Sequence, residues 1–549
     1  MKNTFIISFL FCLNLVFSQG EANIWYFGER AGLDFNSGSA TVLNDGQINT
    51  LEGCSTISSS SGQLLFYTDG STVYDRTHQI MQNGTGLLGG SSSTQSSVIV
   101  PNPSNPNRYY IFTTSEANQS TGVCYSEVDI SLNDGLGSVT ANKNIVLLSG
   151  EVTEKLTSVK HSNGQDYWVL CHDYSNDAYH AFIVTSSGVS PSSIISNIGS
   201  IMDTYNSKIG YLKFSPDGSK LANAFIGNTS LAIEIFDFNN TTGMLSNVQT
   251  LNSPYAPYGV EFSASGNILY VTKRQYISFT SGIYYLMQYD LTSSNVQATE
   301  QVIYSINQHG AFYGFGALQM APDGMIYLAI FDGVVLNEPN RYISRIENPE
   351  VIGIGCNFNL NAIDLFPGFC LTGLPQFIQS YFNANFNFQN TCFGETTQFA
   401  LTGNQTVNSV AWDFGDGATS ISLNPSHTYS APGNYTVTAT ITGNTETITQ
   451  TRTITIYEIP VANGVADVSL CSPSSSYNLS QHISTILGSQ SGNVFGVEFY
   501  YSLGDAETSL NKIVNPINLN QGNNLFFAKV FNLGNRSCDA ITSFNVAWF

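Results

Sequence analysis

A tight polar turn followed at once by an apolar strand recurs through the first two thirds of the chain. Successive copies are spaced by about 52 residues. A glycine or Asp-Gly at each turn supplies the backbone freedom that a sharp reversal needs, and each strand that follows is rich in aliphatic and aromatic residues. The copies are Ser61-Gly62, the degenerate Pro106-Asn107, Asn163-Gly164, Pro216-Asp217-Gly218, Ser265-Gly266 and Pro322-Asp323-Gly324. The sequence therefore predicts a series of similar small sheets.

This period is typical of a β-propeller, in which each blade is a four-stranded antiparallel sheet. Residues 19–384 have room for about seven blades, and six blades is the alternative. One blade reads as strands over 258–263, 268–272, 282–289 and 298–304. Because an open ring would expose a sheet edge, we expect closure by three strands from 23–43 and a fourth from 373–382, which brings Trp25 close to Phe377.

Composition favours an all-β protein over a helical one. Charged residues make up 10% of the chain, aromatic residues 12%, and glycine numbers 48. The net charge of −21 argues against nucleic acid or an anionic membrane as partner, since both would be repelled. Motifs of hydrolases, metalloproteases, nucleotide-binding loops and EF-hands are missing, so a non-enzymatic role without metal or cofactor is favoured.

The N-terminus reads as a secretory signal over residues 1–18. Lys2 provides the positive charge, residues 5–17 are largely apolar, and Ser18 precedes a plausible cleavage point at Gln19. The apolar run is too short to cross a bilayer, and no later segment is long enough. We expect a protein without a membrane span that is secreted or held at the outer cell surface.

Eight cysteines follow the signal. Cys356 and Cys370 flank one loop, while Cys471 and Cys538 lie near opposite ends of the last domain, so these are the two disulfides we expect. The remaining strand cysteines are expected to be buried thiols: Cys54, Cys124 and Cys171. Because no C-x-x-C spacing occurs, a structural zinc site has no support.

Beyond the repeat, Trp412-Asp413-Phe414-Gly415-Asp416-Gly417 runs an aromatic strand into a turn, and a period-two strand follows Pro432-Gly433. The stretch 385–457 resembles the PKD domain, which implies a small extracellular β-sandwich acting as spacer or interaction module. Asp413 and Asp416 resemble calcium ligands of some relatives, but Asp beside Gly is also what a tight turn requires, and the turn is the interpretation we favour. Trp412 is expected in the core.

Residues 458–549 contain short alternating strands and predict an immunoglobulin-like sandwich. The order propeller, PKD, sandwich resembles surface proteins of gliding Bacteroidetes that use type IX secretion. The resemblance is carried by the PKD signature, residues 64–70, residues 373–377, Tyr500-Tyr501 and Asp505-Ala506. Such proteins normally end in a sorting and anchoring domain, whereas the printed sequence stops at Phe549 without one.

In a propeller, the loops between second and third strands and the inter-blade connections gather at one mouth of the ring. Aromatic side chains beside charged ones suit stacking on sugars or clamping a peptide. The alternative is that these aromatics pack between blades and the charges are solvated. The candidate ligand-binding residues are Tyr205, Tyr258, His309, Tyr313, His172, Asp173, Lys273, Arg274 and Asp332.

The sequence thus predicts an exported adhesion-type protein whose propeller binds a cell-surface or extracellular glycan or protein. Two alternatives stay open. One is a polysaccharide hydrolase or lyase using mouth carboxylates such as Asp69, Asp173 or Asp332, and the other is a coat component without a discrete ligand. Neither the ligand nor the oligomeric state follows from the sequence.

Overall fold

The computed structural model describes residues 20–227, 231–278, 281–309, 313–332, 338–382, 385–402, 407–443, 447–470, 476–509 and 511–548. The expected signal peptide lies outside these ranges. The chain divides into two compact units. The first holds Met1–Asn387 with Leu401–Trp412 and Thr438–Arg452, and the second holds Phe388–Ala400, Asp413–Val437 and Thr453–Phe549.

The first unit begins with a three-stranded antiparallel sheet of β1 (Ile24–Phe27), β2 (Ala31–Asp34) and β3 (Thr41–Leu43), as expected from the sequence. Two sheets follow that are joined where β7 pairs with β11. Their strands are β4 (Cys54–Ser58), β5 (Leu64–Thr68), β6 (Thr72–Asp75), β7 (Ile80–Thr85), then β8 (Ser97–Asn102), β9 (Asn105–Thr114), β10 (Val123–Asp129), β11 (Ser138–Val139) and β12 (Ile145–Leu148).

Four more sheets follow in sequence order, and each is antiparallel. Their strands are β13 (Val152–Lys160), β14 (Tyr167–Asp173), β15 (Ala178–Thr185), β16 (Gly188–Val189), β17 (Ile194–Asn197); β18 (Leu212–Phe214), β19 (Lys220–Ile226), β20 (Leu231–Asn239), β21 (Met244–Asn252); β22 (Ala256–Phe262), β23 (Ile268–Ser278), β24 (Ser281–Asp290), β25 (Gln301–His309); and β26 (Tyr313–Met320), β27 (Ile326–Asp332), β28 (Tyr342–Ile346), β29 (Phe358–Asp364). Short 3-10 turns occur between strands of the first unit, at Asn133–Gly135, Asn206–Lys208, Val296–Thr299, Glu338–Arg341 and Gly353–Cys356.

The recurring turns join the first and second strands of these sheets, as predicted. Each places its glycine in the left-handed region that other residues rarely adopt, with φ of +80° at Gly62, +75° at Gly164, +68° at Gly218, +72° at Gly266 and +76° at Gly324. At Gly218 the preceding Asp217 carboxylate accepts the Ser219 N–H at 3.1 Å. Local turn chemistry therefore sets the sheet spacing.

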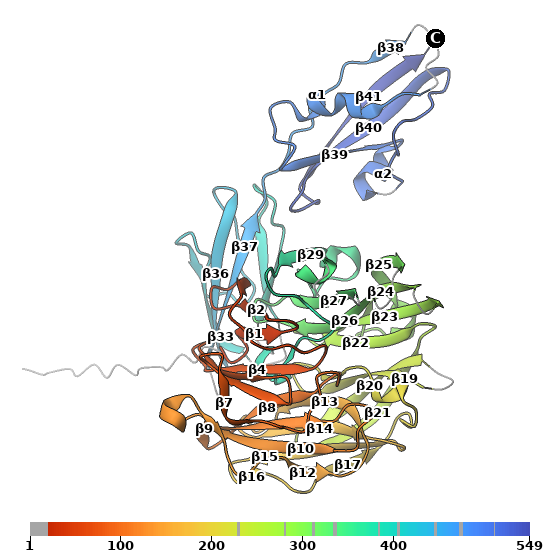
Figure 1. The fold of residues 1–549 in the computed structure, drawn as a ribbon. Coiled ribbons are helices and arrows are strands. Elements are labelled where there is room, and N and C mark those ends of the chain that lie inside the picture. Colours follow the sequence, from red (N-terminus) through yellow and green to blue (C-terminus); the bar gives the residue numbers. More distant parts are fainter. Residues whose placement is uncertain are drawn as a thin grey trace, which may run out of the picture. The chain divides into compact units, whose positions relative to one another are not determined.

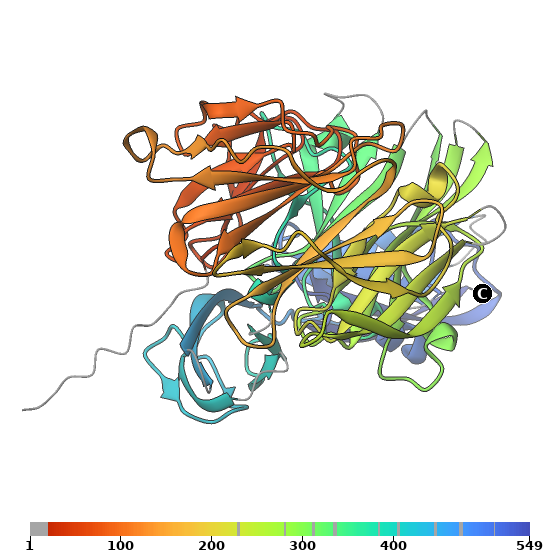
Figure 2. The ribbon, with the colours of Figure 1, turned by 90° about the horizontal axis from the view of Figure 1, so that it is seen from below.

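Hydrogen bonds connect the inner strands and the segments beside them into a closed circuit. They run from Gly53 N to Ser93 O (2.9 Å), Gln95 N to Glu154 O (3.2 Å), Lys155 Nζ to Gly210 O (2.9 Å), Tyr211 N to Tyr258 O (2.9 Å), Thr272 Oγ1 to Gly316 O (3.0 Å), Ala317 N to Thr372 O (2.8 Å) and Thr372 N to Leu51 O (2.9 Å). The sheets therefore follow one another around a common axis (Figures 1 and 2), and the ring is shut on itself.

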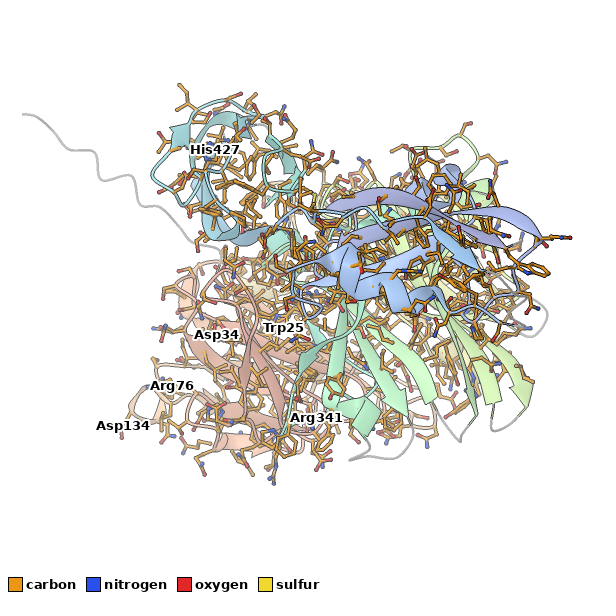
Figure 3. The ribbon with its side chains drawn as sticks, turned by 90° about the horizontal axis from the view of Figure 1, so that it is seen from above. Trp25, Asp34, Arg76, Asp134, Arg341 and His427 are labelled. Atoms are coloured by element: carbon orange, nitrogen blue, oxygen red, sulfur yellow. A yellow bond between two sulfur atoms is a disulfide. The ribbon has the colours of Figure 1, made fainter. Side chains whose placement is uncertain are left out.

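The closing segment differs from the expectation in its pairing. Its strand β30 (Pro375–Gln376) pairs in parallel with β4, whereas its link to the first sheet is a single bridge between Glu29 and Phe369. The reason lies at Gly373, where a Cβ would stand 1.8 Å from the Glu52 carbonyl oxygen, so glycine lets the segment approach the residues before β4. The Trp25 and Phe377 ring centroids are nevertheless 5.7 Å apart, and Trp25 is labelled in Figure 3.

This segment occupies the axis of the ring. Thr372 contacts Leu51 and Ala317 beside the starts of inner strands, and the Gln376 side chain accepts a hydrogen bond from Gln95 Nε2 at 2.8 Å. Farther on, Ser380 Oγ, in the 3-10 turn Gln379–Phe382, accepts the N–H of Lys160 at the far end of β13. The segment therefore runs from one end of the inner strands to the other.

Residues 385–456 form two facing sheets that carry the Trp412 motif. One contains β31 (Asn385–Gln389), β32 (Thr397–Thr402) and β35 (Ser426–His427), and the other β34 (Thr419–Ser420), β33 (Val407–Asp413), β36 (Gly433–Gly443) and β37 (Thr447–Ile456). Trp412 is buried with its ring 5.0 Å from that of Phe386, which confirms its core role. Asp413 accepts the Gly415 N–H and Asp416 the Ala418 N–H, so both carboxylates build the turn.

The C-terminal residues differ from the immunoglobulin-like sandwich that the strand pattern predicted. Their described strands β38 (Val468–Leu470), β39 (Phe495–Tyr500), β40 (Gly522–Asn532) and β41 (Asp539–Trp548) form one sheet in the order β38-β41-β40-β39. Two short helices, α1 (Ile483–Leu487, after a 3-10 turn at Leu479–His482) and α2 (Leu503–Thr508), contact β39 and β40. Helices, which short alternating strands gave no reason to expect, therefore cover this sheet.

Both predicted disulfides are wrong. Cys538 bonds to Cys392, 146 residues earlier, and so cannot pair with Cys471, which itself lies outside the described residues. Cys356 and Cys370 are both free and buried. They have different neighbours, because Cys356 lies beside the Tyr270 hydroxyl and Cys370 lies near Cys54. Cys54, Cys124 and Cys171 are buried thiols as predicted.

Candidate functional site

One end of the ring collects the segments that connect second to third strands and one sheet to the next. We call this end the loop face and define it by residues 49–53, 69–71, 86–96, 115–122, 173–177, 198–211, 253–258, 274–278, 281–284, 341–342 and 365–372. Hydrogen bonds hold neighbouring parts together, such as Lys208 Nζ to Ala117 O at 2.8 Å and Ser92 N to the Glu116 carboxylate at 3.1 Å. These connections make the loop face an ordered surface.

Aromatic side chains are exposed on the loop face. Tyr205, Tyr276 and Phe366 keep 59%, 64% and 62% of their surface accessible. Beside them, the Tyr255 ring stacks on Tyr285 of β24, with centroids 4.7 Å apart and an interplanar angle of 9°. Such rings can stack on the apolar faces of sugars or on planar side chains.

Cations lie over several aromatic rings of the loop face. Lys208 Nζ stands 3.9 Å from the centroid of Tyr174 and also pairs with Glu151. Arg341, labelled in Figure 3, stands over Phe366 at 5.0 Å and pairs with Asp364. The loop face therefore alternates aromatic and charged groups, as a surface for polar ligands requires.

Two carboxylates approach each other where the loop face meets the axis. Glu154 accepts the Thr94 N–H and Oγ1–H at 2.8 and 2.6 Å and the Ala117 N–H at 2.7 Å, yet burial raises its pKa above the ordinary value. Burial, and then the charge of Glu154, raise the pKa of Glu52 well above its ordinary range. The buried Tyr258 hydroxyl lies beside Glu52.

A buried lysine stands next to this carboxylate pair. Lys155 Nζ donates to the carbonyls of Ile209, Gly210 and Ala224 at 3.1, 2.9 and 2.6 Å. Burial lowers its pKa to about 7, against the opposing influence of Glu154. Its role in the structure is to tie the inner strand of one sheet to the next.

The structure separates the predicted mouth residues into three groups. Tyr205 is exposed on the loop face and Arg274 is half-buried there. Asp173 is partly accessible but is used in a turn with Tyr174 N–H and Asn176. The residues of the second group have buried side chains. The third group is His309, Tyr313 and Asp332, whose side chains lie outside the described part of the chain. The buried ones are His172, Lys273 and most of Tyr258.

His172 and Lys273 do not belong to the exposed surface, for identifiable reasons. His172 packs edge-on against Tyr179 with ring centroids 4.3 Å apart, and burial lowers its pKa to about 3. Lys273 turns into its own sheet, where Nζ meets the Tyr289 hydroxyl at 2.5 Å and Glu300 at 3.2 Å. Asp69, offered as a catalytic carboxylate, accepts the N–H groups of Ser71 and Thr72.

Sequence reasoning missed Glu52 and Glu154. They belong to different sheets and sit in no motif, so only the closing of the ring brings them together. Within the described ranges, no group of three or more His, Cys, Asp or Glu side chains is arranged to hold a metal ion. Nor does any helix there have the length and apolar character of a membrane span.

Family comparisons identify the two C-terminal regions. Residues 384–457 match the PKD domain model. The chain carries a PKD domain. Residues 467–548 match the Flavobacterium inter-domain disulphide bond domain. The Cys392–Cys538 bond links this region to the PKD region. Together with the PKD domain, this disulfide is consistent with an extracellular protein.

Solved structures resemble separate parts of the chain. The PKD1 domain of Vibrio anguillarum Epp is 34% identical over 14% of this chain and 93% of its own, with a TM-score of 0.13. A putative 6-phosphogluconolactonase from Bacteroides fragilis NCTC 9343 is 15% identical over 68% of this chain and 94% of its own, with a TM-score of 0.33.

Kuenenia stuttgartiensis hydrazine synthase is 10% identical over 69% of this chain and 94% of its own, with a TM-score of 0.34. Neither this likeness nor the phosphogluconolactonase one says what the present chain binds. No curated protein sequence matches the chain. The protein is all-β, with propeller-like structural neighbours and a PKD domain.

Proposed function

We propose that this is an exported binding protein whose propeller holds an extracellular glycan on its loop face. The PKD domain and the C-terminal disulphide-bond domain then act as spacers. The observation that carries the proposal is the exposure of Tyr205, Tyr276 and Phe366 on one ordered end of the ring, beside charged groups. Amphipathic rings next to hydrogen-bonding groups suit sugars, which present apolar C–H faces and polar edges.

The finer organisation belongs to the same proposal. Residues 19–384 are taken as seven blades, with the three-stranded β1–β3 sheet and the segment 369–378 sharing the seventh position. Support comes from the closed hydrogen-bond circuit and from the 5.7 Å approach of Trp25 to Phe377. Residues 385–457 and 458–549 follow as the two smaller modules.

Export and surface display are also proposed. The signal-like segment 1–18 and the acidic, sparsely charged composition support release from the cell. A type IX route and a link to gliding motility follow from the resemblance to Bacteroidetes surface proteins. Mass spectrometry of the culture medium checks this proposal, which requires a mature N-terminus at Gln19.

Glycan binding is tested with the full mature protein on an array of neutral and acidic polysaccharides. Tyr205→Ala and Tyr276→Ala should each weaken binding about fivefold, since an aromatic contact contributes about 1 kcal/mol. Tyr501→Ala is the matched control, because Tyr501 is 59% exposed but lies outside the ring. Equal loss in the control, or binding unaffected by both loop-face changes, refutes the assignment.

A second candidate function is cleavage of an extracellular polysaccharide, by a hydrolase or a lyase reaction. It is favoured by one observation, namely that Glu52 and Glu154 lie close enough for the charge of one to raise the pKa of the other. A carboxyl group whose pKa is raised by burial and by a neighbouring carboxylate can hold its proton and serve as a general acid. Release of reducing ends by the wild type, abolished in Glu52→Gln, would favour this enzyme over the binding protein.

A further inference from the structure

Arg274 occupies an unusual position on the loop face. It lies near the end of β23, directly across from Tyr284 on β24, and precedes the exposed Tyr276 by two residues. Its guanidinium stands over the Tyr276 ring at 4.3 Å and over the Tyr284 ring at 5.2 Å. Stacking of this kind holds the guanidinium plane against the rings and leaves its N–H edge available.

Three other cations in or next to the loop face form ion pairs, whereas Arg274 forms none within the described ranges. Lys208 pairs with Glu151, Lys273 with Glu300, and Arg341 with Asp364. Among the described residues Arg274 forms no ion pair, and its Nε is buried without a hydrogen bond. Because the Nε is enclosed, only the two terminal nitrogens of the guanidinium can reach a ligand, and a guanidinium charge that no carboxylate balances favours an anionic acceptor there.

We propose that Arg274 and Tyr276 form a subsite for the acidic group of a glycan, a carboxylate or a sulfate, bound at the loop face. This inference rests on the proposed glycan binding. The planar N–H edge of Arg274 matches two oxygens of a carboxylate or sulfate, and the neighbouring Tyr276 ring offers a surface for the sugar that carries them. Lysine would supply the charge but neither the fork geometry nor the stacking.

The charge of the whole protein limits the kind of acidic glycan. With a net charge of −21, the protein repels a polymer that carries an acidic group on every sugar. A single well-placed cation instead suits a mainly neutral glycan in which acidic sugars are sparse. The subsite therefore selects an isolated acidic residue within a neutral chain.

The test uses the full mature protein and four soluble probes made from one neutral glucan: unmodified, sparsely carboxylated, sparsely sulfated and densely carboxylated. Wild type should bind a sparsely acidic probe about tenfold more tightly than the neutral glucan. It should bind the densely carboxylated probe no more tightly than the neutral glucan. Arg274→Gln should abolish the difference, so that this variant binds the sparsely acidic probes no more tightly than it binds the neutral glucan. Arg274→Lys should retain a minor part of the gain.

Arg108→Gln is the matched control. Arg108 follows the turn at Pro106-Asn107, at the end of the ring opposite the loop face, and it pairs with Glu127 and Asp129. It should bind every probe as wild type does. Equal affinity of wild type for neutral and sparsely acidic glucans, or no effect of Arg274→Gln on the difference, overturns the subsite while glycan binding stands. Failure of wild type to bind any probe overturns both the subsite and the glycan proposal. Thermal unfolding of each variant separates misfolding from lost contacts.

Discussion

At the scale of single residues, burial determines which charged groups can face a ligand. His172 and Arg274 each lie near the end of the second strand of a sheet, β14 and β23 respectively, and looked equivalent in sequence. In the structure the imidazole is enclosed against Tyr179 while the guanidinium lies on exposed tyrosine. No local pattern distinguishes the two, because burial at the end of a strand depends on the neighbouring sheet.

Lys155 gives a residue-scale prediction for stability against pH. Its pKa is about 7 in the folded protein and near 10.4 in an unfolded chain, so between these values the unfolded state binds more protons. The free energy of unfolding contributed by this group therefore rises with pH from about 7 upward, by about 2 kcal/mol between pH 7 and 9. Lys155→Met should remove this rise.

Urea unfolding followed by tyrosine fluorescence at pH 7, 8 and 9 measures the effect as a difference between wild type and Lys155→Met. Taking the difference cancels the titration of buried cysteines and tyrosines, which both proteins share. The control is Lys220→Met, since Lys220 is partly exposed and paired with Asp237. A pH-independent difference for Lys155→Met would contradict the assigned environment.

At the scale of elements, local signals predicted well and pairing between distant elements did not. The turns at Gly218 and Gly324 were recognisable because an Asp-Gly pair fixes its own backbone. The partner of β30 was not, since the choice between β1 and β4 depends on the close approach that Gly373 allows. Two helices in the C-terminal region were likewise missed, because α1 and α2 are too short to show a helical period.

Gly373 is the element-scale test of ring closure. Gly373→Ala places a Cβ against the Glu52 carbonyl and should displace the closing segment, lowering the midpoint of thermal unfolding by several degrees. Gly464→Ala, where an added Cβ meets nothing within 4 Å, should leave the midpoint unchanged. Equal midpoints for both variants would mean that the segment does not close the ring in this way.

The Cys392–Cys538 bond is the second element-scale test. Closing a loop of 146 residues restricts the unfolded chain, so Cys538→Ser should destabilise the C-terminal unit by about 2–4 kcal/mol. Cys124→Ser is the control, because that thiol is free. Non-reducing peptide mapping should recover a peptide linking 392 to 538, and one linking 471 to 538 would restore the pairing expected from the sequence.

At the scale of the whole molecule, the fold class and the order of regions were accessible from sequence, whereas the candidate site was only partly so. Periodic turns and the Trp412 motif are local, so they survive in a single sequence. The pairing of Glu52 with Glu154 arises only when distant sheets meet at the axis. The exposed Tyr205 and the half-buried Arg274 were found because loop position alone indicates them, whereas Tyr276 and Phe366 needed coordinates.

The central claim is that a glycan binds the loop face of the ring, and hydrogen exchange of the full mature protein with and without a bound polysaccharide tests it most directly. The account predicts slower amide exchange in peptides from 198–211, 253–258 and 274–284, with the PKD and C-terminal regions unchanged. Protection confined to residues 385–548, with none on the loop face, would contradict it.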